Sequence, residues 1–164
     1  MRFLLYLVRE THSTISFIYY MQDTTLGKDR NMKILVIDAQ GGGIGRQLIT
    51  AIKQNIPTAT VTAVGTNTAA TSAMLKAGAD GAATGENAVM VGCRNADVIV
   101  GPIGIVIADS MLGEVTPKMA LAVAQSKAKR ILLPFSHCDN IVVGVSGYHV
   151  EQLIQEAVEH MRQA

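Results

Sequence analysis

The sequence predicts an α/β fold in which helices cover both faces of a doubly wound, mostly parallel sheet of about six strands. Three observations lead to this prediction. Strand-like and helix-like segments alternate from residue 33 onward, their connections are short, and the first strand-like run ends in a glycine-rich turn that opens a helix. Such alternation is typical of three-layer αβα folds, because parallel neighbours need crossover helices. Residues 32–164 contain no repeat or linker, so we interpret them as a single domain.

The first half of this domain contains three strand-and-helix pairs. The predicted strands are 33–38, 59–64 and 80–85, and the predicted helices are 43–55, 68–79 and 86–96. The first strand, KILVID, is apolar enough to be a central strand buried on both faces. One face of the first helix carries Ile44, Leu48, Ile49 and Ile52. Gly78 stands where a left-handed residue would end the second helix.

The second half is expected to add three strands and two helices. The predicted strands are 97–103, 129–135 and 140–145, and the predicted helices are 116–128 and 148–163. Thr116 as N-cap followed by Pro117 is a favourable helix start. The inward face of the last helix is predicted to carry Val150, Leu153, Ile154, Ala157 and Val158.

Residues 1–31 differ from the patterned domain. They hold two of the three phenylalanines and three of the four tyrosines, show no clean period, and end in a polar run. The run FLLYLV is too short for a signal peptide and is followed by Arg9 and Glu10. Codons for Gly-Lys-Asp-Arg-Asn can be nearly all purine, as in a ribosome-binding site. We therefore expect Met32 to be the true start and the extension to be poorly ordered; a hairpin or helix packed on the domain is the alternative.

Composition excludes several classes of function. The net charge of +1, the lack of Lys/Arg clusters and the 4% of aromatic residues argue against a nucleic-acid binder. The apolar runs never reach the roughly 18 residues of a membrane span. Cys93 and Cys138 form no CxxC pattern, which favours reduced thiols in a cytoplasmic protein and no metal site. The 49% of hydrophobic and 16% of charged residues favour a surface covered by another copy, in a homo-dimer or higher homo-oligomer.

The strongest functional signal is the stretch KILVIDAQGGGIGRQLI, residues 33–49. A glycine-rich turn at a helix start leaves N–H groups unpaired in front of the positive helix end, which favours an anion. The dinucleotide fingerprint is matched only in part, because Asp38 and Gln40 stand at its first two glycine positions. The looser short-chain dehydrogenase pattern fits through Gly43 and Gly45, with Ala39 in place of its first glycine. The alternative is that the glycines serve only a tight turn.

The end of the second strand supplies neutral hydrogen-bonding groups, in Thr66 and Asn67, instead of the acidic residue that usually holds a ribose. Arg46 could pair with a phosphate or be an exposed helix residue. No Walker lysine follows the glycines, so a P-loop nucleotidase is not expected. The residues predicted to contact the ligand are Gln40, Gly41, Gly42, Gly43, Ile44, Gly45, Arg46, Thr66, Asn67 and Thr84.

Polar residues recur where the predicted strands end, and in an open α/β sheet ligands bind at that edge. They are, strand by strand, Asp38 and Gln40, Thr66 and Asn67, Thr84, Glu86 and Asn87, Asp109 and Ser110, and Ser136, His137 and Cys138. Asp38 would repel a phosphate at close range. It could contact a sugar hydroxyl or an amine of the ligand, or it could brace the loop through N–H groups.

Three further segments have alternative interpretations. Thr84 could cap the helix that Glu86 opens. Residues 101–117 are too long and apolar for an ordinary connection, so they either close over a ligand or pack on a partner subunit, with Asp109 and Glu114 as titratable members. His137 and Cys138 are neighbours on extended chain and point to opposite sides, which argues against a nucleophile and base pair.

The strings IDAQGGGIGR and GPIGIVIADS, with AVGTNTAATSAMLKAGAD, ATGENAV and NIVVGV, resemble a bacterial conserved-domain family of unknown function, over residues 32 to about 162. The resemblance implies a bacterial, cytosolic origin and a start at Met32. It implies no activity and no catalytic residues. A broader similarity to Rossmann-like nucleotide binders rests on Gly43, Gly45 and the order of elements.

Three hypotheses about function follow. The first is a Rossmann-like protein that binds a nucleotide or dinucleotide, such as NAD(P), at the glycine turn; in an oxidoreductase, Thr84, Asp109 and His137 would be the first candidates for proton transfer. The second is a non-catalytic dimeric sensor or accessory module for a small anionic metabolite. The third is an enzyme acting on a phosphorylated small molecule, with Asp38 as acid or base.

Overall fold

The structure is a computed structural model that describes residues 31–135, 140–145, 147 and 149–164. The chain divides into two units, Met1–Asn31 and Met32–Ala164, and the second is treated by itself below. Our expectation that the N-terminal extension lacks order lies outside the described residues.

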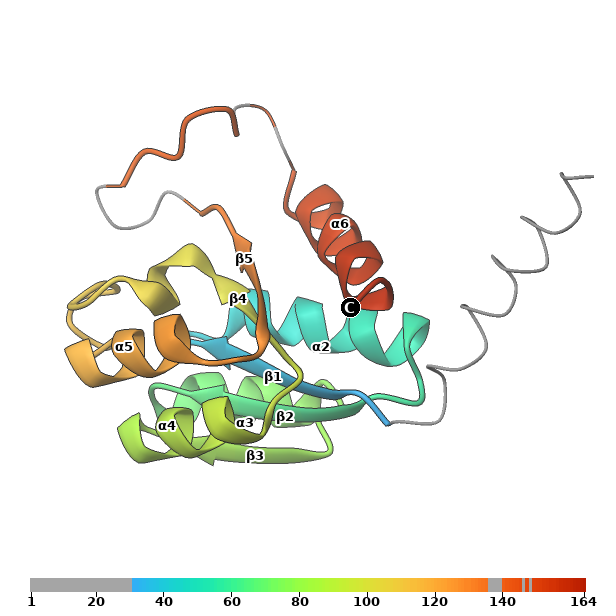
Figure 1. The fold of residues 1–164 in the computed structure, drawn as a ribbon, viewed down its shortest axis with the longest axis horizontal. Helices are drawn as coiled ribbons and strands as arrows, with labels where there is room; N and C mark the ends of the chain where they lie inside the picture. Colours follow the sequence, from blue (N-terminus) through green and yellow to red (C-terminus); the bar gives the residue numbers. More distant parts are fainter. Residues whose placement is uncertain (1–30, 136–139, 146, 148) are drawn as a thin grey trace, which may run out of the picture. The chain divides into compact units, whose positions relative to one another are not determined.

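The described residues of the domain form a five-stranded sheet in which every neighbouring pair is parallel (Figure 1). Its strands are β1 (Lys33–Asp38), β2 (Thr60–Gly65), β3 (Gly81–Thr84), β4 (Val98–Pro102) and β5 (Lys129–Leu133). Their order is β3-β2-β1-β4-β5, so the chain moves outward from β1 to β3 and then returns to the other side of β1. The predicted α/β class is confirmed, and the strand order reverses between β1 and β4.

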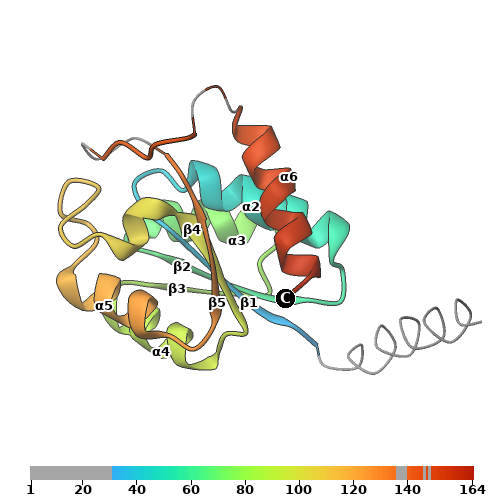
Figure 2. The ribbon, with the colours of Figure 1, turned by 45° about the horizontal axis from the view of Figure 1, so that its top comes forward.

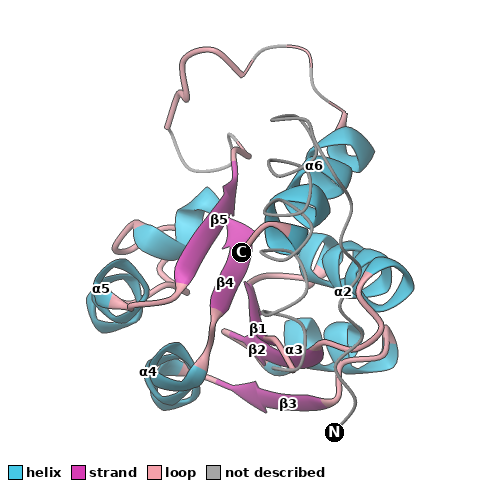
Figure 3. Cartoon of the chain, turned by 45° about the vertical axis from the view of Figure 1, so that its right-hand side comes forward, coloured by secondary structure: helices cyan, strands magenta, loops and turns pink. Residues whose placement is uncertain are grey.

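Helices cover both faces of this sheet, as Figures 1 and 3 show. One face carries α2 (Gly43–Asn55), α3 (Thr68–Lys76) and α6 (Val150–Arg162), and the other carries α4 (Glu86–Asn95) and α5 (Pro117–Gln125). A short 3₁₀ helix, η1 (Ile103–Val106), follows β4. The result is the three-layer, Rossmann-like arrangement that the alternation of segments predicts. None of the helices in the described ranges combines the length and apolarity that a membrane crossing requires.

The core has one apolar cluster on each side of the sheet. The predicted face of α2 is confirmed, because Leu48, Ile49 and Ile52 are fully buried against β1 and α6. The predicted helix signals are also confirmed: Gly78 is left-handed, with φ +104°, and the Thr116 hydroxyl accepts a 3.2 Å hydrogen bond from the N–H of Met119. Local sequence therefore marks the end of α3 and the start of α5.

Two local predictions are wrong. Residues 140–145 form loop and turn instead of a sixth strand, and Ile141 and Val143 are 90% and 92% exposed. Strand-like sequence alone does not supply a pairing partner. Thr84 does not cap α4, whose N-cap is Gly85 without a side-chain hydrogen bond. Its hydroxyl instead lies 2.7 Å from that of Thr71, which joins α3 to the end of β3.

Candidate functional site

The glycine turn after β1 contains glycines of two kinds. Gly42 has φ +68°, and a Cβ there would lie 2.7 Å from the backbone Cα of Ala70 in α3. A Cβ at Gly45 would lie 2.8 Å from the Cβ of Asp38. A Cβ at Gly41 or Gly43 would meet nothing within 4 Å, and neither residue has a positive φ. The fold therefore requires glycine at positions 42 and 45 but gives no reason for it at positions 41 and 43.

Asp38 ends β1 and braces this turn from within. One carboxylate oxygen accepts a 2.8 Å hydrogen bond from the N–H of Ala39, and the other accepts a 2.6 Å bond from the N–H of Gly45. Burial raises the pKa of the Asp38 carboxyl above its ordinary value, the N–H groups of Gly45, Ala39 and Ile44 oppose this, and the nearby charge of Glu114 adds to it. The carboxylate thus already occupies the positive end of α2 that was expected to attract an anion.

Two N–H groups of the turn remain open. Gly42 closes the turn by donating to the carbonyl of Ala39, at 3.0 Å, and Gln40 donates to Glu114. The N–H groups of Gly41 and Gly43 donate no hydrogen bond within the described part of the chain. Both residues are exposed. The capacity of the turn to hold a ligand oxygen is concentrated at these two glycines.

Glu114 connects the loop after β4 to the ends of β1 and β2. Its Oε2 accepts hydrogen bonds from the N–H of Gln40 at 2.9 Å, the hydroxyl of Thr66 at 2.5 Å and the amide of Asn67 at 2.8 Å. Partial burial raises the pKa of the Glu114 carboxyl, but these three bonds outweigh it and hold the pKa below the ordinary value. The predicted contact residues at positions 40, 66 and 67 are therefore brought together by a carboxylate of the protein.

The loop of residues 103–116, seen beside the start of α2 in Figure 2, has an unusual backbone. Asp109, Met111 and Leu112 have φ values of 62°, 56° and 62°, in the left-handed region that non-glycine residues rarely enter. Such residues cost about 1–3 kcal/mol each. The buried Ser110 hydroxyl donates a 2.6 Å hydrogen bond to the carbonyl of Gly104 and ties the loop to η1. Tertiary contacts therefore maintain this conformation.

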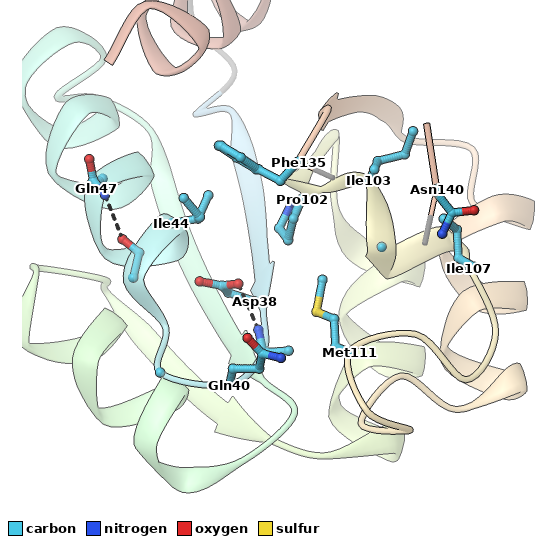
Figure 4. A pocket seen from close by; sticks show the side chains of 14 residues that line it. Asp38, Gln40, Ile44, Gln47, Pro102, Ile103, Ile107, Met111, Phe135 and Asn140 are labelled. Atoms are coloured by element: carbon cyan, nitrogen blue, oxygen red, sulfur yellow. Dashed lines mark hydrogen bonds between the residues drawn. The ribbon is translucent and has the colours of Figure 1, made fainter. Parts of the chain in front are cut away.

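A pocket of about 250 Å³ lies between β1 and β4, at the point where the strand order reverses (Figure 4). Its polar members are the Asp38 carboxylate, three side-chain amides and the open glycines, and its remaining walls are mostly apolar. The lining residues are Asp38, Ala39, Gln40, Gly41, Gly43, Ile44, Gln47, Pro102, Ile103, Gly104, Ile107, Met111, Phe135 and Asn140. They include neither lysine nor arginine. In open α/β sheets this crevice is where ligands bind.

A family model, described as "Domain of unknown function (DUF3842)", matches residues 33–164. The chain belongs to this family. No curated protein matches the chain. The family description carries no activity.

The DUF3842 domain brings only some of the predicted contact residues to the pocket. Four of them line it, namely Gln40, Gly41, Gly43 and Ile44. Gly42 and Gly45 are buried behind the turn, and Arg46 is exposed on α2 outside the lining. Thr66 and Asn67 contact Glu114, and Thr84 contacts Thr71.

The other predicted polar residues lie away from the pocket or outside the described residues. Asp109 belongs to the loop of residues 103–116 but not to the pocket lining. Glu86 accepts hydrogen bonds from Thr116 and Lys118, which joins α4 to α5. His137, together with Ser136 and Cys138, falls outside the described residues. Within the described ranges no three His, Cys, Asp or Glu side chains are grouped so that they could hold a metal ion.

Among the lining residues of the DUF3842 domain that sequence analysis did not single out are Gln47, Met111, Phe135 and Asn140. Gln47 has a signal in the sequence, because it follows Gly43 by one helical turn and therefore shares its face of α2. The other three come from segments after β4 and β5, and only the folded chain brings them beside β1.

Proposed function

We propose that the DUF3842 domain binds a small organic ligand in the pocket between β1 and β4, as a binding or sensor module. The observation that carries this proposal is the pair Gly41 and Gly43. Neither backbone conformation nor packing requires glycine there, yet both line the pocket, and their N–H groups donate to none of the described residues. Glycine at such positions permits the close approach of a ligand to the backbone.

The charges of the pocket favour a ligand bearing hydroxyl or amine groups over a strongly anionic one. Asp38 contributes a carboxylate, Glu114 lies near it, and the lining includes no basic side chain. Donor groups of the ligand suit the Asp38 carboxylate, while its carbonyl or hydroxyl oxygens suit the N–H groups of Gly41 and Gly43. Ile44, together with the apolar side chains opposite it, would cover the ligand's body. A neutral or cationic ligand therefore fits these charges better than the small anionic metabolite of the sequence-based hypothesis.

A nucleotide or dinucleotide is the second candidate, and one observation favours it. Arg46 is exposed three residues after Gly43, so a phosphate held outside the pocket by the open N–H groups would lie near a positive charge. In this arrangement the ribose or base would enter the pocket. The pocket volume of about 250 Å³ is large enough for part of a dinucleotide but too small for the whole molecule.

A thermal-shift screen against nucleosides, sugars, amines, NADH, NADPH, ATP and sugar phosphates tests the proposal, because a ligand of the native state raises the Tm. Each hit is then measured with Gly41→Ala and Gly43→Ala, which should weaken its binding about tenfold or more by blocking backbone approach. Gly81→Ala is the matched control, since a Cβ at Gly81 on β3 also meets nothing within 4 Å. Hits that bind all three variants equally would refute this site.

Arg46→Gln separates the two candidates. It should weaken only phosphate-bearing ligands, and the affinity of those ligands should fall as salt is added. A neutral ligand should be indifferent to both changes.

A further inference from the structure

The outer edge of β5 is open in the part of the chain that the structure describes. β5 ends the sheet order and pairs with β4 alone among the described strands. The N–H of Lys129 donates to Asp97 on the β4 side, so the peptide groups of Arg130 and Leu132 point the other way. Such an edge can accept another strand.

A groove of about 470 Å³ runs beside this edge, between β5 and α6. Apolar side chains form much of its wall, among them Ile131 and Leu133 from β5 and Leu153 from α6, and Gly144 and Val145 from the chain before α6 also line it. The groove therefore offers backbone groups along one side and an apolar surface along another, which are the two features that β-augmentation uses.

The same chain carries an unpaired strand-like segment, residues 141–145, with the sequence IVVGV. It forms no strand in the structure, and Ile141 and Val143 are 90% and 92% exposed. Large β-branched residues favour a pleated, half-buried surface. Their side chains alternate with period two, so residues 141, 143 and 145 would share one face of a strand.

Gly144 and Val145 reach the groove of their own copy, but little chain remains to lay the whole segment along its own β5 edge. The last turn of α6 reaches the end of α2, where Arg162 donates a 3.2 Å hydrogen bond to the carbonyl of Asn55. Because α2 begins at the carboxyl end of β1, α6 begins at the edge of the sheet where β5 ends (Figure 1). A segment 141–145 laid back along β5 would end about 15 Å from that edge. The four residues 146–149 would then have to carry the chain back to Val150. They would have to be fully extended, and their path would run through the groove.

We propose that residues 141–145 pair with the β5 edge of a second copy of this chain, and that the exchange is reciprocal in a two-fold symmetric dimer. Each copy offers one edge and one segment, so a single two-fold axis satisfies both. The segment has no charge to oppose Lys129 and Arg130 at the start of the edge. Each sheet gains the sixth strand that the sequence predicts.

The proposed exchange would also affect the pocket between β1 and β4. Phe135 and Asn140 both line that pocket. In the sequence, Phe135 follows β5 by two residues and Asn140 directly precedes the segment 141–145. Pairing of the segment with a second copy would hold this wall of the pocket in place. The dimer proposal itself does not depend on the identity of the ligand.

Sedimentation of the full chain tests the dimer. The wild type should have a sedimentation-derived mass of twice 17.4 kDa. Val143→Asp should raise the dimer Kd by about 100-fold or more, because each dimer loses two buried side chains and buries two charges. Leu112→Asp is the matched control, since Leu112 is 96% exposed but lies in another loop, and it should leave the dimer intact. A monomeric wild type, or a dimer indifferent to Val143→Asp, would overturn the proposal.

Cysteine cross-linking tests the partner of the segment directly. A chain carrying Ile131→Cys, Val143→Cys and Cys138→Ser should form a disulfide between copies, seen as a doubled mass on a non-reducing gel. A disulfide confined to one copy, with the mass unchanged, would show that the segment folds back on its own β5 and would overturn the exchange.

Discussion

The glycine turn after β1 and the loop of residues 103–116 form facing walls of one pocket, but different forces determine their conformations. In the turn, Gly42 is left-handed, and the backbone of α3 leaves no room for a Cβ at this position. In the loop, the left-handed positions include Asp109, Met111 and Leu112, and the contacts of Glu114 hold the loop against the strand ends. The turn therefore requires glycine at position 42. The loop, like Gln40 in the turn with φ 52°, holds non-glycine residues in the left-handed region through contacts distant in sequence. Substitutions can test this difference.

Gly42→Ala should have the largest effect. Its Cβ would meet the Ala70 backbone at 2.7 Å, at a φ of +68°. We expect a loss of about 3 kcal/mol in the free energy of unfolding, measured by urea titration. Gly43→Ala in the same turn should change it by less than about 0.5 kcal/mol. Equal losses in the two variants would contradict the division of the glycines into two kinds.

Glu114→Ala should come second, with a loss of about 2 kcal/mol, because three donors in the turns that follow β1 and β2 lose their acceptor at once. Hydrogen exchange should show faster exchange at the N–H of Gln40, while the amides of α2 beyond its first turn keep their protection. Glu114→Gln, which keeps one acceptor oxygen, should lose less. If the alanine variant unfolds at the wild-type urea concentration, the loop does not depend on this carboxylate.

The pH dependence of stability should have opposite signs for the two carboxylates. The raised pKa of Asp38 means that the folded state binds its proton more tightly, so this group's contribution falls as pH rises from its ordinary value of 3.8 through the folded pKa. The lowered pKa of Glu114 means that its contribution is present above 4.5 and is lost as pH falls through the folded pKa.

Urea midpoints of the wild type, Asp38→Asn and Glu114→Gln, between about pH 3 and about pH 7, measure these contributions. The advantage of the wild type over Asp38→Asn should shrink as pH rises, and its advantage over Glu114→Gln should grow. Parallel curves for all three proteins would show that neither carboxyl changes its pKa on folding.

Leu112→Gly should have the smallest effect and the opposite direction. Leu112 is 96% exposed at a φ of 62°, so glycine removes left-handed strain without removing a contact. We expect a gain of about 0.5 kcal/mol, since part of the relief is offset by the freedom of glycine in the unfolded chain. Leu121→Gly is the control: Leu121 is 54% exposed within α5, and glycine there should cost about 1 kcal/mol. A loss in both would mean that Leu112 is not strained.

Much of the fold could be predicted because its signals are local. Apolar periodicity indicated α2 and α6, Gly78 and Thr116 marked helix ends, and the β-branched run after Met32 indicated the central strand. The sixth strand could not be predicted correctly, because residues 140–145 have strand propensity but pairing needs an edge within reach. Propensity describes a segment, whereas pairing is a property of the whole topology.

The candidate site was predictable on one side only. The sequence placed ligand contacts at the glycine turn, and Gln40, Gly41, Gly43 and Ile44 do line the pocket. Sequence analysis named Glu114 as a titratable loop residue, but the Gln40 N–H that it binds lies 74 residues away. Nothing in either segment alone indicates that contact.

By itself, the sequence determined the α/β class, the end of α3, the start of α5 and the presence of a tight glycine turn after the first strand, since each depends on residues within a few positions of one another. Tertiary structure alone decided that Asp38 would occupy the positive end of α2, that Glu114 would hold together the ends of β1 and β2, and that residues 141–145 would form no strand within one copy. These outcomes depend on distances between segments far apart in the chain, which are set only once the sheet has assembled and its helices have packed.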